Sequence, residues 1–233
     1  MEKQRVLIVD DEQDICDLIE IYLSNEGLEV VKASDGIEAL NVLKEMDIDL
    51  IILDVMMPKM DGIQACMQIR KDKSMPIIML SAKGEDLDKI LGLNTGADDY
   101  VTKPFNPLEI VARVRSQLRR YKVLNHPSLE SKDEIQVGDL VINTAAHQVF
   151  LEDKEIRLTP TEFSILETLM RNKGRVLSTQ RIYELVWSES AFECENTVAV
   201  HIRNLREKIE INPKEPRYIK VVWGVGYKVE MDN

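Results

Sequence analysis

Five short apolar runs in the first half of the chain alternate with stretches of helical periodicity. Runs of this length are typical of strands buried on both faces, and the intervening helices supply the connections that parallel strands need. The pattern predicts an α/β domain over residues 1–121, built on a five-stranded, doubly wound parallel sheet. The strands are expected at residues 6–9, 30–33, 50–53, 77–80 and 100–102, and the helices at 14–26, 36–46, 62–72, 84–95 and 107–121.

The pattern changes beyond residue 121. Residues 122–133 are polar, contain Pro127 and follow neither periodicity, so they are predicted to form a linker. Residues 134–233 predict an α+β domain that contains a helix-turn-helix with a β-hairpin wing. Its strands are expected at 135–137, 140–143, 148–151 and 155–158, its helices at 160–172, 178–186 and 195–209, and its hairpin at 218–229.

The charge of the chain is unevenly distributed. Of the net charge of −11, only −3 belongs to residues 132–233, which hold 14 basic and 17 acidic residues. DNA binding needs only a local basic face, so the acidic total does not exclude it. Three scattered cysteines favour free thiols over a disulfide framework or a zinc site. Without a membrane-length apolar stretch or a signal-peptide pattern, the protein is expected in the cytoplasm, away from membranes.

Polar residues stand where four of the five predicted strands of the first domain end. Because the carboxyl ends of parallel strands share one edge of a sheet, these residues are expected to converge. Three carboxylates in one place repel one another and need a cation, and an all-oxygen site suits Mg²⁺ better than zinc. The residues, in strand order, are Asp10, Asp11, Asp54, Ser81 and Lys103.

These residue types in one site predict phosphoryl transfer. Asp54 would attack a phosphoryl donor to give an aspartyl phosphate. Lys103 and Mg²⁺ would neutralise the transferring oxygens, and the Ser81 hydroxyl would hydrogen-bond one of them. Each residue taken alone has a plainer explanation, since an aspartate after a strand is usually a turn or a helix cap. The prediction therefore depends on their shared position at the strand ends.

The segments VLIVDDE, LIILDVMMPKMDG, PIIMLSA and GADDYVTKPF resemble the signature segments of response-regulator receiver domains. The resemblance covers nearly all of residues 1–121 and implies a flavodoxin-like sheet with Asp54 as the phosphoacceptor. It also implies that Asp10, Asp11, Asp54 and the main-chain carbonyl of Met56 surround Mg²⁺, directly or through water. Such a receiver takes its phosphoryl group from a sensor histidine kinase.

The same resemblance implies a switch and a dimer. Ser81 and Tyr100 match the family's switch pair, in which the hydroxyl moves toward the phosphate and the aromatic ring turns inward. The alternative is that Tyr100 is an ordinary, partly exposed aromatic residue of a strand. The segment GADDYVTKPFNPLEIVARVRSQLRR is similar to the OmpR/PhoB subfamily, whose phosphorylated receivers form homodimers. A single surface ion pair contributes only about 0–1 kcal/mol, so the dimer prediction depends on the whole set. The matching charged positions are Lys89, Asp98, Asp99, Glu109, Arg113 and Arg120.

The helix predicted at residues 195–209 has one apolar stripe, and its other faces are expected to be exposed. Arginine and asparagine read base edges, and valine contacts the thymine methyl group, so this composition suits the major groove. An amphipathic helix with arginines is, however, more often an ordinary surface helix. The base-reading candidates are Asn196, Val200, Arg203 and Asn204. The flanking candidates for phosphate contact include Thr197, His201 and Arg206.

The segments LTPTEFSILETLMRNKGRVLSTQRIYELVW, TVAVHIRNLREKI and YIKVVWGVGYKV are similar to the winged-helix effector domain of the same subfamily. The resemblance implies binding to promoter DNA in repeated half-sites and a loop at residues 188–194 that can face RNA polymerase. In this family the wing often carries an arginine at the position where this chain has Trp223. The contact of the wing with DNA is therefore left to Lys220, to Lys228 or to Trp223 itself. VVWGVGYK and LRRYK also resemble regulators of vancomycin resistance.

The function expected is a phosphorylation-gated, DNA-binding transcriptional regulator that is not an enzyme, beyond catalysing its own phosphotransfer and dephosphorylation. One alternative is a phosphoaspartyl enzyme of the Mg²⁺-dependent phosphatase kind. Those enzymes need an acid two residues after the nucleophile, and here that position is Met56. A second alternative is a constitutively dimeric DNA-binding protein that works without phosphorylation.

Overall fold

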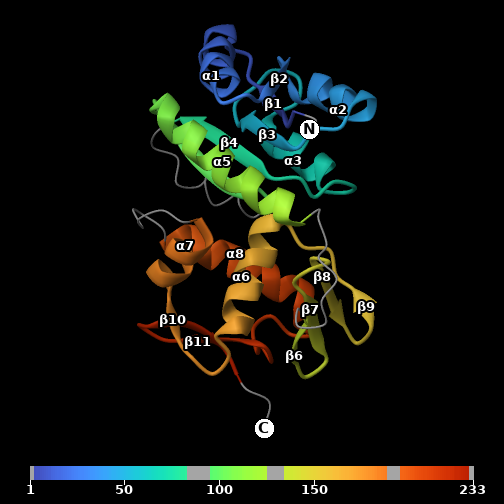
Figure 1. Cartoon of the computed structure of the whole chain (residues 1–233), viewed down its shortest axis with the longest axis vertical. Coiled ribbons are helices and arrows are strands. Elements are labelled where there is room, and N and C mark those ends of the chain that lie inside the picture. The colour runs from blue at the N-terminus through green and yellow to red at the C-terminus, as the bar shows by residue number, and fades with distance from the viewer. Residues whose placement is uncertain (1–2, 83–94, 125–133, 188–194, 231–233) are drawn as a thin grey trace. The chain divides into compact units, whose positions relative to one another are not determined.

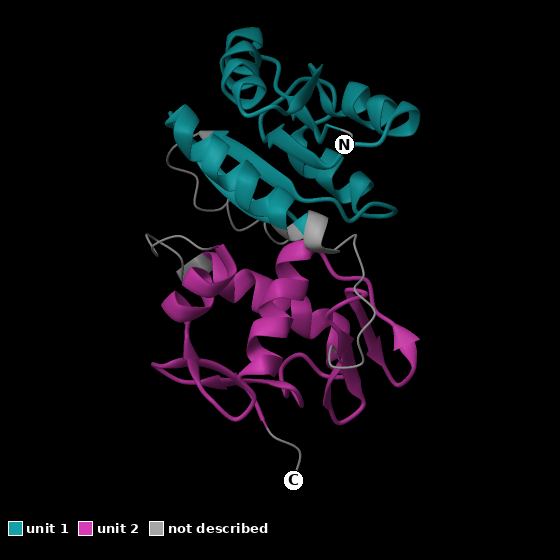
Figure 2. Cartoon of the chain, viewed as in Figure 1, with its two compact units in different colours: residues 1–121 teal, residues 122–233 magenta. Residues whose placement is uncertain are grey.

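The computed structural model describes residues 3–82, 95–124, 134–187 and 195–230. The chain divides into two compact units, residues 1–121 and 122–233 (Figure 2). Each unit has its own hydrophobic core. Among the described helices, none combines the length and the apolar character needed to cross a membrane.

The first unit is a parallel sheet with helices on both faces (Figure 1). The strand order is β2-β1-β3-β4-β5, and every neighbouring pair is parallel. The predicted fold class is therefore confirmed. The elements are β1 (Arg5–Val9), α1 (Gln13–Asn25), β2 (Glu29–Ala33), α2 (Gly36–Glu45), β3 (Leu50–Asp54), α3 (Gly62–Ile69), β4 (Ile77–Ala82), β5 (Asp99–Lys103) and α5 (Pro107–Leu124).

Alternation along the strands divides the core between the two faces of the sheet. Ile8, Ile52 and Leu80 are fully buried on the face that α1 and α5 cover, together with Leu23 and Val114 of those helices. Helices α2 and α3 pack against each other, and α2 also packs on β1 and β2. Because both faces are covered, β3 is buried along its whole length.

Glycine at position 62 lets α3 begin directly against the end of β3. A Cβ atom there would lie 2.0 Å from the carbonyl oxygen of Asp54, a distance that no side chain tolerates. The Asp61 side chain caps the helix by accepting a hydrogen bond from the backbone N–H of Gln64 at 2.7 Å. The chain segment that follows Asp54 is thereby held close to the carboxyl edge of the sheet.

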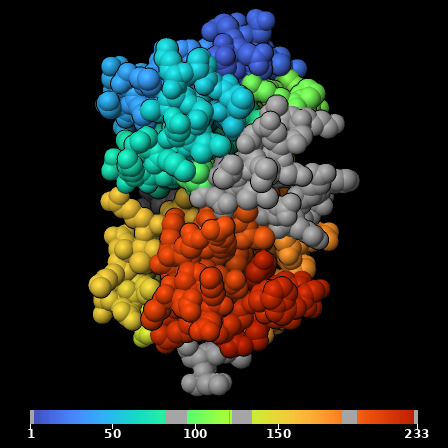
Figure 3. All heavy atoms as spheres, turned by 180° about the vertical axis from the view of Figure 1, so that it is seen from behind, coloured from blue at the N-terminus to red at the C-terminus, as the bar shows by residue number. Residues whose placement is uncertain are grey.

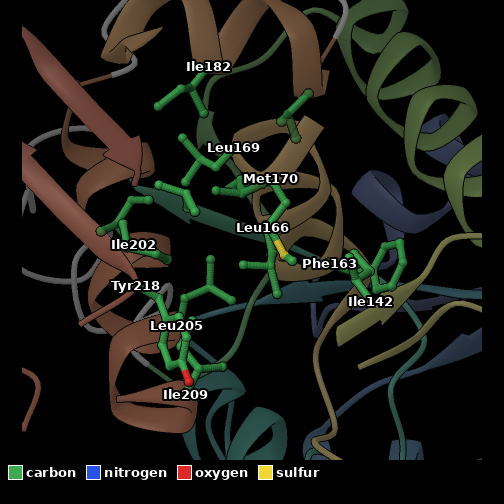
Figure 4. Packing of buried hydrophobic residues seen from close by; sticks show 14 of the residues in the cluster. Ile142, Phe163, Leu166, Leu169, Met170, Ile182, Ile202, Leu205, Ile209 and Tyr218 are labelled. Carbon is green, nitrogen blue, oxygen red and sulfur yellow. The ribbon is translucent and has the colours of Figure 1, made fainter. Parts of the chain in front are cut away.

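The second unit packs three helices between two small antiparallel sheets. Apolar side chains of all three helices meet in its core, where Leu166, Ile202 and Leu205 are buried (Figure 4). The elements are β6 (Glu134–Val137), β7 (Leu140–Asn143), β8 (Gln148–Leu151), β9 (Lys154–Glu155), α6 (Pro160–Arg171), β10 (Leu177–Ser178), α7 (Thr179–Trp187), α8 (Glu195–Ile209), β11 (Ile219–Val222) and β12 (Gly226–Val229).

Helix α6 begins with a capping box. Thr159 accepts a hydrogen bond from the backbone of Glu162, whose carboxylate accepts one from the backbone of Thr159. Lys208 of α8 also lies 2.6 Å from the buried Glu162 carboxylate, so the same group ties α8 to the start of α6. The buried cap therefore fixes two of the three helices relative to each other.

Most of the predicted elements are present, and the differences occur at short or terminal segments. Helix α5 continues to Leu124, so the first three residues of the expected linker are helical. The strand expected at 155–158 is the two-residue β9, and β10 was not predicted. The helix expected at 84–95 and the rest of the linker, 125–133, lie outside the described residues.

Candidate functional site

The first unit carries three carboxylates at the point where its strand order reverses. Asp10 and Asp11 follow β1, and Asp54 ends β3, the strand next to it in the sheet. One carboxylate oxygen from each of the three lies within 4.8 Å of the others. This is the edge at which open α/β sheets bind ligands, and the convergence predicted for these residues is observed. The cluster could hold a metal ion.

Lys103 supplies the positive charge of the site. Its Nζ atom lies 2.7 Å from Asp10 Oδ2 and 2.8 Å from Asp54 Oδ1. Burial by itself would lower the pKa of Lys103, but its hydrogen bonds to these two carboxylates raise that pKa above its ordinary value. The lysine is therefore charged and holds two buried carboxylates from different strands together.

Asp54 is buried, with 4 % of its surface exposed. Burial raises its pKa to about 6, and the neighbouring Asp10 charge acts in the same direction. The hydrogen bond from Lys103 and the one from the backbone N–H of Met56, at 3.0 Å, act in the opposite direction. A carboxylate that resists ionisation in spite of a lysine contact is one that a further cation would stabilise.

The remaining predicted groups of this site lie on β4 and β5 or beside β3. Ser81 is buried at the end of β4, and the side chain of Met56 is exposed. Tyr100 is also buried, with 7 % exposed, so the alternative of a partly exposed strand aromatic is wrong. Met79 pairs with Tyr100 and Ser81 with Thr102, which places Ser81 and Tyr100 on the same face of the sheet.

One charged neighbour of the site was not predicted. A carboxylate oxygen of Glu12 lies 3.5 Å from Lys103 Nζ. The backbone N–H of Glu12 also donates to Asp10 Oδ1 at 2.9 Å, which helps to orient the Asp10 carboxylate toward the lysine. In the sequence, Glu12 directly follows the acidic pair at the end of the first strand, but this position does not show that its side chain turns toward Lys103.

The charged positions predicted for dimerisation form ion pairs within the chain. Asp98 is fully buried, and its carboxylate accepts from Arg70 at 2.7 Å and from the backbone of Ile77 at 3.0 Å. Asp99 is also buried, against Arg113 at 2.9 Å. Both aspartates are therefore buried against arginines of the same unit.

The structure describes only some of the other positions predicted for the dimer. Glu109 is exposed on α5, where it pairs with Arg113 at 2.8 Å. Lys89 and the side chain of Arg120 lie outside the described residues. A role for any of the six positions in a dimer stays a prediction.

Helix α8 is covered on more sides than its apolar stripe indicates. Arg203 is exposed and pairs with Glu207 at 3.0 Å, whereas Thr197, Val200, His201 and Asn204 are buried. One cause is visible: α8 packs against both α6 and α7, and the His201 ring lies 5.7 Å from that of Trp187 in α7. The expected exposure of Val200 and Asn204 is thus not observed, and the side chain of Asn196 lies outside the described residues.

Arg206 and Trp223 are the last two DNA-binding candidates, and they differ in their surroundings. Arg206, expected at phosphate, donates to the backbone carbonyl of Ile219 in β11 at 3.1 and 2.7 Å. Trp223, between β11 and β12, is 88 % exposed. Arg206 therefore attaches the hairpin to α8, and the hairpin presents a tryptophan to solvent.

Comparison with known proteins agrees with this two-part architecture. Residues 6–115 match the family model of the response regulator receiver domain, and residues 153–229 match that of the C-terminal domain of transcriptional regulatory proteins. The chain is 49 % identical to the regulatory protein VanRc of Enterococcus gallinarum, over 97 % of this chain and 99 % of that protein. It is 45 % identical to PhoP of Bacillus subtilis, the alkaline phosphatase synthesis transcriptional regulatory protein, over 97 % of each.

Two solved structures that match along the whole chain are also similar. A mutant of the protein RitR matches with a TM-score of 0.75 and 30 % identity, over 98 % of this chain and 100 % of the other. The response regulator DrrB, described as an OmpR/PhoB homolog of Thermotoga maritima, matches with a TM-score of 0.52 and 33 % identity over the same shares. With a receiver followed by a DNA-binding domain along its length, the chain belongs to the OmpR/PhoB family of two-component response regulators and resembles VanR.

Proposed function

We propose that Asp54 is the phosphoacceptor of this regulator and that phosphorylation controls its binding to promoter DNA. The observation that carries the proposal is the buried Asp54 carboxylate, held at 2.8 Å by Lys103 beside Asp10 and Asp11 at the carboxyl edge of the sheet. The domain boundaries that we propose are residues 1–121 for the receiver, 122–133 for the linker and 134–233 for the effector. The match to a transcriptional regulatory domain supports a location in the cytoplasm, where bacterial promoters are.

The phosphoryl step needs few groups. A carboxylate oxygen of Asp54 forms a bond to phosphorus while the bond from phosphorus to the imidazole nitrogen of a kinase phosphohistidine breaks, and the imidazole keeps the electron pair. The Lys103 ammonium neutralises charge on the transferring oxygens, and the Ser81 hydroxyl donates a hydrogen bond to one of them. The chain catalyses only this transfer and the later hydrolysis of its own aspartyl phosphate.

The donor set of the site fits Mg²⁺. Asp10, Asp11 and Asp54 offer only oxygen ligands, which suit a hard cation, and we propose that the main-chain carbonyl of Met56 completes the set. When bound, the ion supplies positive charge that stabilises the ionised Asp54 and the oxygens of the incoming phosphoryl group. The raised pKa of Asp54 supports this assignment, since a buried carboxylate next to a second one needs more positive charge than Lys103 provides.

Phosphorylation must be transmitted from Asp54 to the rest of the receiver. We propose that Ser81 and Tyr100 transmit it, because they occupy one face of neighbouring strands beside the site. A homodimer formed through β5, α5 and the helix expected at 84–95, which lies outside the described residues, is the proposed result. Arg113 would then have to exchange its contacts with Asp99 and Glu109 for contacts with the partner.

In the effector unit, α8 and the hairpin are the proposed DNA-binding elements. The exposed Arg203 is a candidate for base contact in the major groove, and pairing of two effector units would place two such helices on repeated half-sites. Linking two weak DNA contacts in one dimer raises their effective concentration. RNA polymerase is the further partner proposed for a regulator of this family.

The coupling is tested by comparing the wild type with Asp54→Asn, each with and without acetyl phosphate and Mg²⁺. Sedimentation is expected to show dimers only for the treated wild type. The DNA probe is a duplex that the treated wild-type chain selects from random sequence, and only the treated wild type should gain affinity for it. Equal dimerisation and DNA binding in all four samples would contradict the proposal and favour a constitutive DNA-binding protein.

A further inference from the structure

A further buried carboxylate stands just after a strand of the first unit. Asp35 follows β2 and caps α2, and only 2 % of its surface is exposed. Its Oδ1 atom accepts hydrogen bonds from the backbone N–H groups of Ile37 and Glu38 at 2.9 Å each. The cap uses one carboxylate oxygen, so the other oxygen of this buried group needs a partner of its own.

Lys59 is the partner of that second oxygen. Its Nζ atom lies 2.5 Å from Asp35 Oδ2. This hydrogen bond lowers the pKa of Asp35 and raises the pKa of Lys59, so both groups are ionised at neutral pH. The lysine side chain is 65 % exposed, and an ion pair between two exposed side chains would contribute little. Here the carboxylate is buried, so losing the lysine would leave a buried charge without its cation.

Lys59 lies in the segment that connects β3 to α3, residues 55–61, the β3–α3 loop. The loop begins next to the proposed phosphoacceptor, where the backbone N–H of Met56 donates to Asp54 Oδ2 at 3.0 Å. Lys59 adopts a φ of +63°, a left-handed conformation that costs a lysine free energy. A residue stays in such a conformation only when contacts around it hold it there, and the ion pair with Asp35 is one such contact.

The far end of the loop is also held to the start of α2. The backbone N–H of Gly36 donates to the carbonyl of Met60 at 3.2 Å. A Cβ atom at position 36 would lie 2.8 Å from Met60 Cγ and 3.0 Å from its carbonyl oxygen, so α2 approaches the loop this closely because it begins with glycine. The light-blue residues of α2 accordingly lie at the surface next to the cyan residues that follow β3 (Figure 3). Asp35 and Gly36 together fasten the β3–α3 loop to the segment that follows β2.

We propose that Lys59 and Asp35 are positioning residues for the metal site, because their ion pair holds the β3–α3 loop in the conformation that binds Mg²⁺ through the main-chain carbonyl of Met56. The proposal rests on the magnesium site proposed above. A carboxylate ligand can rotate about its own side-chain bonds to follow an ion, whereas a main-chain ligand moves only with its loop. Neither Lys59 nor Asp35 belongs to the proposed ligand set, so the phosphoryl step should not depend on them once the site is filled.

A positioning role and a simple charge effect predict opposite results for Lys59. Removing a positive charge near three carboxylates would by itself strengthen the binding of Mg²⁺, and removing the charge of Asp35 would by itself weaken it. If the ion pair positions the loop, both substitutions weaken the binding, because each removes the same contact. For the same reason their effects should not add when they are combined.

Urea unfolding of the full-length chain in increasing MgCl₂, at constant ionic strength, tests the proposal. The stability that each variant gains over its own value in EDTA gives its dissociation constant for Mg²⁺. Lys59→Met is expected to raise that constant about tenfold, the scale of losing a group that orients a metal ligand. Asp35→Asn, which can still cap α2, should raise it as well, and the double variant should bind no more weakly than the weaker single variant.

Two controls accompany these variants. Lys59→Arg keeps the ion pair and should bind Mg²⁺ as the wild type does. Lys71→Met, at an exposed lysine just beyond α3, removes the same charge and should not weaken the binding. In addition, the rate of adduct formation from acetyl phosphate, followed by intact mass, should reach the wild-type value in Lys59→Met once MgCl₂ is saturating. Only the Mg²⁺ concentration that this rate requires should be higher.

Three outcomes would overturn the proposal. Lys59→Met could bind Mg²⁺ as tightly as the wild type or more tightly, the effects of Lys59→Met and Asp35→Asn could add in the double variant, or the rate of Lys59→Met could stay low at saturating MgCl₂. If the wild type itself gains no stability from Mg²⁺, the proposed metal site fails, and the positioning role fails with it.

Discussion

Replacing Asp54 by asparagine should stabilise the protein when no metal is present. In the folded chain the pKa of Asp54 is raised from 3.8 to about 6, with burial as the largest cause. Asparagine has nearly the same shape and keeps an oxygen that can accept from Lys103, but it carries no charge to bury. The variant therefore removes the penalty that the ionised carboxylate imposes on the folded state.

The size of the effect follows from linkage. A raised pKa in the folded state means that the folded chain binds more protons than the unfolded chain between the two pKa values, so stability falls as pH rises through that window. One pKa unit corresponds to about 1.4 kcal/mol, which gives a penalty of about 2–3 kcal/mol once Asp54 is fully ionised. The gain of Asp54→Asn should thus be near zero at about pH 4 and complete by about pH 8.

Urea unfolding of both proteins in EDTA, across this pH range, measures the difference. Asp72→Asn, at an exposed aspartate, is the matched control, and its free energy of unfolding should stay within about 0.5 kcal/mol of the wild type. Adding Mg²⁺ should stabilise the wild type more than Asp54→Asn, because the ion binds the folded acidic cluster. Burial of the Asp54 charge would not destabilise the fold if Asp54→Asn were no more stable than the wild type at about pH 8, or if its gain persisted unchanged at about pH 4.

Three further substitutions test other parts of the account. Lys103→Met should slow the formation of the phosphoryl adduct from acetyl phosphate by about a hundredfold, which is the scale of losing one charge-stabilising group. Intact mass spectrometry follows this rate, and an unchanged rate would exclude the lysine from the phosphoryl step. Arg70→Met removes the ion pair of the buried Asp98 carboxylate with Arg70 and should lower the free energy of unfolding by about 3 kcal/mol, whereas a change below about 1 kcal/mol would contradict a buried pair. Thr159→Ala removes one half of the α6 capping box and should cost about 1 kcal/mol in urea unfolding, with Thr168→Ala, within the same helix, as the comparison.

The acidic site could be predicted from the sequence because its position follows from strand topology. Asp10 and Asp54 each stand directly after a buried apolar run, and parallel strands bring such positions to one edge whatever the details of packing. Lys103 was predicted for the same reason. Glu12 was missed because its contact depends on a side-chain conformation rather than on the strand end.

The sequence did not reveal which charged residues pair with one another within the fold. The sequence marks Asp98 as acidic, but it does not show that Arg70, at the end of α3, donates to its carboxylate. On α8, an apolar stripe predicts one buried side, whereas two helices pack on it and bury more of its surface than the stripe indicates. The strand expected at 155–158 is only the two-residue β9, and the two-residue β10 is too short for periodicity to reveal it.

The central claim is that Asp54 accepts the phosphoryl group, and intact mass spectrometry after incubation with acetyl phosphate and Mg²⁺ tests it most directly. We expect a single phosphoryl adduct on the wild-type chain, with none on Asp54→Ala and none on the wild type in EDTA. An adduct that survives Asp54→Ala, or the absence of any adduct on the wild type, would contradict it.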